Sequence, residues 1–267
     1  MIGCQGGVCG RGRSPRYYVW YVALGMMLSS VWGEGLHAET GDDIMAKVYE
    51  QARLHKDQQA DVQLIIADDE GRERERFFTL RSKIFSGRTK SLVKFYEPAS
   101  VRGTALLSET LDEESHPSQW IYLPAFRSIK QLNSDDQNKS FVGSDFTNGD
   151  VAGRKVERDT HKIIEDKDKV VIIESTPKDK DDYYAKLEVH VLRAISIPVR
   201  IVFYDRTGER LKTLNNKGIQ KIKGMYTVVE SVMENHQTGG KSTLIKSNID
   251  YDTVIDEQLV GFKGLQM

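Results

Sequence analysis

The residues that could carry out chemistry are scattered along this sequence and form no catalytic motif. The six histidines occur singly, and neither HExxH nor HxH joins any two of them. Such spacings would place two imidazoles on one metal ion, so no zinc site is expected. Both cysteines, Cys4 and Cys9, precede the first long apolar stretch. We therefore expect neither a metal ion nor another cofactor.

Two further segments resemble reactive motifs only in part. GGKST at 239–243 looks like the end of a phosphate-binding loop, but the first glycine is missing at the required spacing, so a hairpin turn is expected. The acidic and amide residues near position 140 do not have the twelve-residue spacing of a calcium loop. These residues are Asp135, Asp136, Asp145, Asn148 and Asp150. No GxSxG nucleophile elbow occurs, and the sequence predicts that the protein is not an enzyme.

Residues 1–38 are organised like a secretory signal peptide. Three arginines between positions 11 and 16 precede an apolar stretch at 17–32 that is short for a membrane span. Cleavage after Ala38 would release the chain, and no cysteine follows the apolar stretch to carry a lipid anchor. An uncleaved N-terminal anchor is the alternative, because Leu36 is bulky for a cleavage site. Both interpretations place the rest of the chain outside the cytoplasmic membrane.

The elements that must position any site are mostly strands. Thr40 and Asp42 are plausible caps for an amphipathic helix over residues 43–55. Period-2 alternation then recurs along residues 39–267, which we expect to form a single domain with about ten or eleven strands. A sheet of that size must curl. The fold class is mainly β with helices (α+β), and a net charge of −1 with no concentrated basic face gives no reason to expect a nucleic-acid partner.

The segment from Trp120 to Asp150 combines an apolar block with a polar corner. WIYLPAFRSIKQL at 120–132 is apolar on both faces of a strand, as expected for a wall between a core and a cavity. Alternation predicts that Ile121 and Leu123 face the concavity, while Trp120 and Tyr122 face the opposite side. The Gly-Ser-Asp and Asn-Gly-Asp triplets that follow are expected to form turns or helix caps.

This segment resembles the signature of the LolA-like proteins, outer-membrane lipoprotein-sorting proteins of the periplasm. The closest likeness is to their longer branch, which is often encoded beside membrane transporters. The motifs VRGTALL at 101–107, IPVRIVFYDRTGERLKTL at 197–214 and MENHQTGGKSTL at 233–244 occur in the order expected of that family. The resemblance covers the chain from about residue 40 onward. It implies an open half-barrel around a helical lid, of the LolA/LolB-like type, located in the periplasm.

The function that follows is that of a carrier. We expect a monomer that binds a lipid or the acyl chains of a lipoprotein in a hydrophobic cavity and transfers this cargo between envelope membranes, with an inner-membrane transporter as a partner. Each chain carbon removed from water contributes about 0.8 kcal/mol. The candidate lining residues lie on one face of the predicted strands and on the predicted lid. They are Ile44, Met45, Val48, Val62, Leu64, Ile66, Val93, Phe95, Ile121, Leu123, Ile201, Phe203 and Val228.

Three alternatives stay open at this point. Each candidate lining residue could belong to an ordinary filled core, because alternation selects a face without saying whether that face is hollow. The protein could instead be an envelope sensor that recognises lipids or mislocalised lipoproteins. A hydrolase acting on an envelope polymer or lipid is the least favoured, because the sequence contains no catalytic set.

Overall fold

The computed structural model describes residues 38–267, so the predicted signal peptide lies outside the described residues except for Ala38. Residues Glu39–Met267 form one compact unit. No helix within the described part of the chain is long and apolar enough to cross a membrane.

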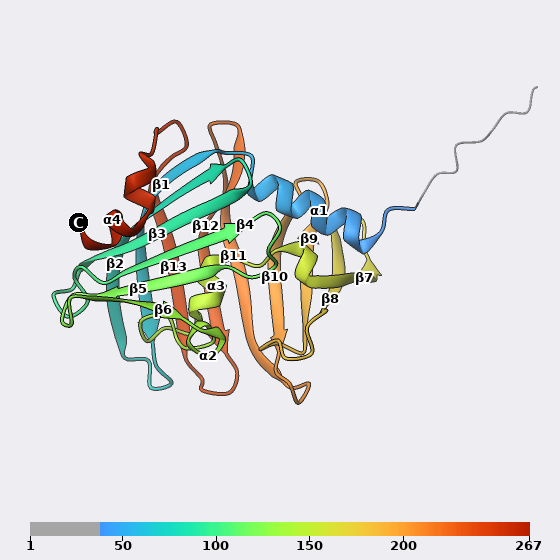
Figure 1. Ribbon diagram of the computed structural model, residues 1–267. Helices are drawn as coiled ribbons and strands as arrows, with labels where there is room; N and C mark the ends of the chain where they lie inside the picture. Colours follow the sequence, from blue (N-terminus) through green and yellow to red (C-terminus); the bar gives the residue numbers. More distant parts are fainter. Residues whose placement is uncertain (1–37) are drawn as a thin grey trace, which may run out of the picture. The chain divides into compact units, whose positions relative to one another are not determined.

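A single antiparallel sheet of thirteen strands makes up most of this unit, and it does not close into a barrel (Figure 1). Strands β1 to β6 form one meander and β7 to β13 a second, and the two are joined where β1 pairs with β13. The free edges of the sheet are therefore β6 and β7. The strands are β1 (Asp57–Ala67), β2 (Glu73–Phe85), β3 (Arg88–Glu97), β4 (Ala105–Leu111), β5 (Ser118–Leu123), β6 (Ser128–Leu132), β7 (Asp159–Asp166), β8 (Val170–Pro177), β9 (Lys186–Leu192), β10 (Ile197–Tyr204), β11 (Arg210–Ile222), β12 (Met225–Asn235) and β13 (Lys241–Asp250).

The architecture confirms the predicted curled, mainly β fold, but the predicted strand count was too low. The apolar block at 120–132 contains two strands, β5 and β6, joined by a tight turn in which Arg127 adopts a φ of 48°. Residues with positive φ are usually glycine or asparagine, so a reversal at an arginine was not expected here. Strand β2, which begins with charged residues, is an internal strand of the sheet.

Helix α1 (Gly41–Ala52) lies against the edge strand β7. Thr40 and Asp43 form a reciprocal capping box, so the helix begins two residues before the predicted start and ends earlier. A Cβ on Gly41 would lie only 2.5 Å from the carbonyl oxygen of His161, which explains the glycine at this contact. The Asp42 carboxylate accepts a hydrogen bond from the His161 backbone N–H (3.2 Å), an otherwise unpaired donor on the sheet edge.

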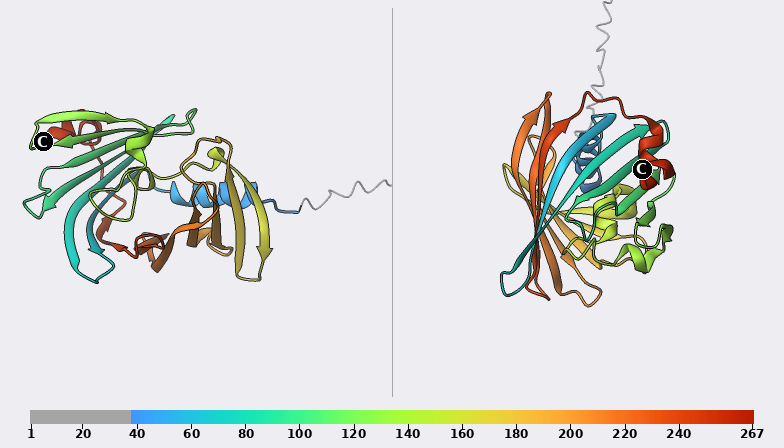
Figure 2. Two further views of the ribbon diagram at one scale, coloured as in Figure 1. Left: turned by 90° about the horizontal axis from the view of Figure 1, so that it is seen from below. Right: turned by 90° about the vertical axis from the view of Figure 1, so that its left-hand side faces the viewer.

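The chain between β6 and β7 crosses the concave face from one edge of the sheet to the other. We call residues 133–158 the crossing segment. It contains α2 (Ser134–Gln137), α3 (Asn148–Ala152) and the 3-10 helix η1 (Val156–Arg158), as seen in Figures 1 and 2. Thr147 and Asp150 form a capping box on α3, which confirms the predicted helix-cap role of the Asn-Gly-Asp triplet.

Side chains sort onto the two faces of the sheet as the alternation predicts. Ile121 packs on the core of the concave face, whereas Trp120 and Tyr122 pack on a smaller cluster on the other face. The 3-10 helix η2 (Glu257–Val260) and α4 (Phe262–Gln266) cover this second cluster. The ring of Phe262 meets that of Trp120 edge-on, with 5.1 Å between the centroids.

Phe141 wedges the crossing segment into the concave core. Its ring is 1% exposed and lies 6.0 Å from that of Phe78 and 5.5 Å from that of Phe95, centroid to centroid. Val142 and Gly143, which follow it, both have positive φ and turn the chain away again. This aromatic cluster fills the concavity over β2 and β3.

We predict that Phe141→Ala lowers the free energy of unfolding by about 3–5 kcal/mol, because it leaves a cavity in a packed aromatic cluster. Urea titration followed by circular dichroism measures this change. Phe126→Ala is the matched control, since Phe126 is 75% exposed in the turn between β5 and β6. It should change the free energy of unfolding by less than about 0.5 kcal/mol. Equal losses of unfolding free energy for the two variants would contradict the packing role assigned to Phe141.

Candidate functional site

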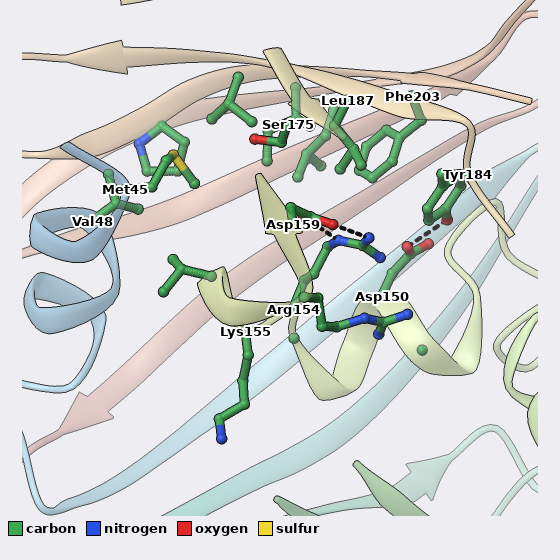
Figure 3. Close-up of a pocket in the computed structure, with 18 of the residues that line it drawn as sticks. Met45, Val48, Asp150, Arg154, Lys155, Asp159, Ser175, Tyr184, Leu187 and Phe203 are labelled. Carbon is green, nitrogen blue, oxygen red and sulfur yellow. Dashed lines mark hydrogen bonds and ion pairs between the residues drawn. The ribbon is translucent and has the colours of Figure 1, made fainter. Parts of the chain in front are cut away.

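An apolar cavity of about 280 Å³ lies between the β8 to β12 part of the sheet, helix α1 and the crossing segment (Figure 3). Its volume is at the lower end of the range for small-molecule pockets. In Figure 3, Leu187 and Phe203 project from the sheet, while Met45 and Val48 approach from α1. The remaining apolar lining residues are Phe146, Val156, Val189, Pro198, Ile201, Leu214 and Met233.

Asp150 organises the polar wall of the cavity. Its carboxylate accepts hydrogen bonds from the Tyr184 hydroxyl (2.7 Å), the Lys212 ammonium (2.5 Å) and the Thr147 backbone N–H (2.7 Å). Lys212 is 2% exposed and also donates to the backbone oxygen of Asp145 (3.2 Å). A buried carboxylate and a buried ammonium therefore neutralise each other, and both have further polar partners.

The same interactions hold the crossing segment on the sheet. Lys212 belongs to β11 and Tyr184 lies just before β9, whereas Asp150 belongs to α3. A second attachment joins Asp145 to β13, where its carboxylate accepts from the Ser242 hydroxyl (2.6 Å) and its backbone N–H donates to the same oxygen (2.9 Å). Asp145 thus anchors the segment, beyond the cap or turn role that its sequence context suggested.

A second charged cluster closes the cavity beside η1. Arg154 donates two hydrogen bonds to Asp159, at 2.7 and 2.5 Å, and its guanidinium also lies 3.1 Å from Asp182. Arg158 donates to the same Asp182 carboxylate at 2.6 Å. Two acids and two guanidinium groups balance one another in this cluster, while Lys155, which also lines the cavity, donates to the backbone oxygens of Leu111, Asp112 and Glu114.

The environment of Asp182 keeps its carboxylate ionised. Burial alone would raise the pKa of Asp182, but Arg154, the backbone N–H of Tyr184 and Arg158 stabilise the charged form. The pKa consequently lies below its ordinary value.

His161 and Ser175 also line the cavity and form a hydrogen bond between β7 and β8. The Ser175 hydroxyl lies 2.8 Å from Nδ1 of His161, and Nε2 lies 2.9 Å from the backbone oxygen of Val156. That second contact requires a proton on Nε2, so Nδ1 of a neutral ring would accept from the serine. Ser175 is only 1% exposed, so its hydroxyl offers almost no surface for attack on a substrate. The pair instead ties η1 to the two strands.

The structure brings four of the predicted lining residues to the cavity wall: Met45 and Val48 on α1, and Ile201 and Phe203 on β10. The other candidates do not line this cavity. Ile44, Val62, Leu64, Ile66, Val93, Phe95 and Ile121 belong to the packed core of the same concave face, whereas Leu123 and Val228 belong to neither core cluster. Contact of any of the thirteen with a ligand stays a prediction.

The predicted lining residues did not include those that the crossing segment and β9, β11 and β12 contribute to the cavity. Leu187 and Val189 alternate clearly with polar residues, so their inward orientation was available from the sequence. The apposition of Asp150 and Lys212 was not, because 62 residues separate them. Within residues 38–267, no group of three or more histidine, cysteine, aspartate or glutamate side chains could hold a metal ion.

Comparison with known proteins identifies relatives of this fold. A family model described as an uncharacterized protein matches residues 87–265, more than half of the chain. None of the curated proteins matches the sequence.

This chain aligns with nearly the whole length of three solved structures. One, from Vibrio parahaemolyticus, is described as an outer membrane lipoprotein-sorting protein domain; it is 27% identical with a TM-score of 0.80, over 85% of this chain and 98% of that one. A DUF1329 family protein from Desulfovibrio piger is 25% identical with a TM-score of 0.79, over the same shares. A LolA superfamily protein from Nitrosomonas europaea is 23% identical with a TM-score of 0.67, over 83% of this chain and 97% of that one, and supports the fold alone.

We predict that Asp182→Asn destabilises the protein by about 3–5 kcal/mol at pH 7, because the largely buried guanidinium of Arg158 loses its carboxylate partner and that of Arg154 keeps only Asp159. The folded-state pKa of Asp182 is lowered, so its contribution is present above the unfolded-state pKa of about 3.9 and is lost as the pH falls through the folded-state value. The difference between wild type and variant should therefore shrink below about pH 4. Urea titrations at several pH values measure it.

Asp181→Asn is the control for this experiment, because Asp181 is an exposed neighbour of the same type. It should leave stability nearly unchanged at every pH. A loss for Asp182→Asn that is independent of pH would contradict the assignment.

Proposed function

Because this chain belongs to the LolA-like family of outer-membrane lipoprotein-sorting proteins, we propose that it is a periplasmic carrier that binds a lipid or the acyl part of a lipoprotein. It works as a monomer and transfers this cargo between the envelope membranes. A membrane transporter, the partner that the resemblance to the longer LolA-like branch implies, supplies or receives the cargo.

The observation that carries this proposal is a hollow, apolar region next to a filled one on the same concave face. Phe78, Phe95 and Phe141 fill the space over β2 and β3, whereas the space over β9 to β12 holds the cavity. An apolar cavity gains free energy when a hydrocarbon chain enters it, at about 0.8 kcal/mol for each buried methylene. Most of the polar groups around it already have partners, and the Nε of Arg158 is the buried atom of this wall that lacks one among the described residues.

Helix α1 is suited to the role of a movable lid. Met45 and Val48 are only partly buried, so the helix closes the cavity with few fully buried contacts. Its N-terminal end is held by polar contacts, Asp42 with His161 and Glu39 with Arg193, which are accessible to solvent. Partly exposed ion pairs are worth about 0–1 kcal/mol each, so the main cost of displacing the helix is the exposure of Ile44, which packs in the concave core.

We predict that the protein purified from the native envelope fraction contains a lipid in near-stoichiometric amount. Organic extraction followed by mass spectrometry measures the amount and identifies the lipid class. The variant Ile201→Trp should carry at least tenfold less, because the indole occupies the cavity that Ile201 lines.

Arg200→Trp is the matched control, since Arg200 is exposed and adjacent in sequence to Ile201 on the same strand. Circular dichroism must show that both variants are folded. A wild-type protein without lipid, or equal lipid content in the two variants, would sink the carrier proposal. A bound lipid that changes affinity for a membrane partner without being transferred would point to a sensor.

The periplasmic location gives a separate prediction. The mature protein should have the mass of residues 39–267, because the signal peptide is removed after Ala38 during export. Intact-mass spectrometry of the protein released from the periplasm by osmotic shock measures this. Recovery of the full 267-residue chain from the membrane fraction would instead support an uncleaved anchor.

A further inference from the structure

Lys246 lies on the concave face in the middle of the sheet. On β13, Ser242 contacts the crossing segment and Leu244 packs on the concave core, so alternation places Lys246 on this same face. It stands opposite Val62 on β1, which in turn stands opposite Phe78 on β2. Both neighbours are buried apolar residues.

The Lys246 ammonium has no partner among the described residues: no hydrogen bond, ion pair or ring contact involves it. The side chain is half-buried, and burial lowers the pKa of its ammonium. The charge of Lys246 acts on His55, which supplies no negative charge in return. Burial chiefly lowers the pKa of His55; Gln58 opposes this through a hydrogen bond, and Lys246 adds to it.

Two other cations on this face differ from Lys246. Lys212 is neutralised by Asp150, as described above. Arg76 lies beneath Gly143 of the crossing segment, where a Cβ would come within 3.7 Å of its guanidinium. Its Nε is buried without a hydrogen-bond partner, so Arg76 is also unpaired, but the crossing segment covers it. Lys246 differs in that it is half-buried between apolar neighbours, lacks a counter-ion in the described part of the chain and keeps access to solvent, and removing an unpaired charge from water costs free energy.

The distance between Lys246 and the cavity suits an amphiphile whose head group lies at Lys246 and whose chain lies in the cavity. Ser242, four residues before it on β13, pairs with the cavity-lining Met233 on β12. Four residues of strand span about 13 Å. Leu214 and Leu244 are only partly buried, so they leave apolar surface on the concave face between the cavity and Lys246.

We propose that Lys246 is the anion-binding residue of the concave face, where its ammonium pairs with the carboxylate or phosphate head of an amphiphile whose chain lies in the cavity. This inference rests on the proposed carrier function and adds the class of cargo. The site would select an anionic lipid with a single or an extended acyl chain over a lipid whose head group is neutral or cationic.

The test compares three ligands with the same twelve-carbon chain: dodecanoate, dodecyl phosphate and uncharged dodecanol. Affinities are measured for the full mature chain by displacement of a fluorescent fatty-acid probe. In Lys246→Met, the affinity for at least one anion should fall about tenfold or more, while the affinity for dodecanol stays within about twofold. The anion with the larger loss identifies the head group as carboxylate or phosphate.

Lys217→Met is the matched control. Lys217 is exposed on β11 and stands opposite Glu230 on β12, which in turn stands opposite Ile245 on β13. Since Ile245 is adjacent to Lys246 on the same strand, Lys217 lies on the opposite face of the sheet. It should leave all three affinities unchanged. Without ligand, Lys246→Met should also raise the midpoint of thermal unfolding, because it removes an unpaired cation from apolar surroundings.

The outcomes separate the two proposals. If dodecanol binds but Lys246→Met weakens all three ligands equally, or none of them, the carrier function stands and the role of Lys246 is overturned. If no ligand binds to the wild-type protein, the carrier function fails and the assignment of Lys246 fails with it.

Discussion

The fold depends on the attachment of the crossing segment to the concave face. A thirteen-stranded sheet with two free edges buries little of that face by itself, and a strongly curled open sheet needs something to pack inside it. The crossing segment supplies this packing with one aromatic wedge, Phe141, and two polar attachments, Asp145 to Ser242 and Asp150 to Lys212. The wedge packs on β2 and β3 of the first meander, and the attachments reach β13 and β11 of the second, so a single loop contacts both meanders.

Polar attachment has a consequence that apolar packing would not have. Asp150 and Lys212 hold the segment in place through a direct hydrogen-bonded ion pair of 2.5 Å. This pair needs no additional side chains packed around it, so the space beside it can stay unfilled. Over β2 and β3 the segment fills the concavity with a phenylalanine ring. Over β9 to β12 it is held by charges, and there the cavity remains.

The sequence predicted the faces but not the distribution of empty space. Alternation placed Ile121 on the concave side and Trp120 on the other, and it selected Ile201 and Phe203, because side-chain direction in a strand depends only on position. Whether a face is filled depends on residues far away in the chain, such as Phe141, that come to lie on it. The buried pair of Asp150 and Lys212 was invisible for the same reason.

The distribution of charge around the cavity favours one orientation of an amphiphilic ligand. Asp150 with Lys212, and Arg154 and Arg158 with Asp159 and Asp182, are balanced within their own clusters, and three backbone oxygens hold the Lys155 ammonium. The charged groups at this end of the cavity therefore already have partners. Toward the centre of the sheet, Lys246 contributes a positive charge that no described residue balances. A chain that entered head first would bring a charged group against paired ions and apolar side chains and would lose its hydration without compensation. Entry tail first leaves the head beside Lys246, where both groups gain a partner.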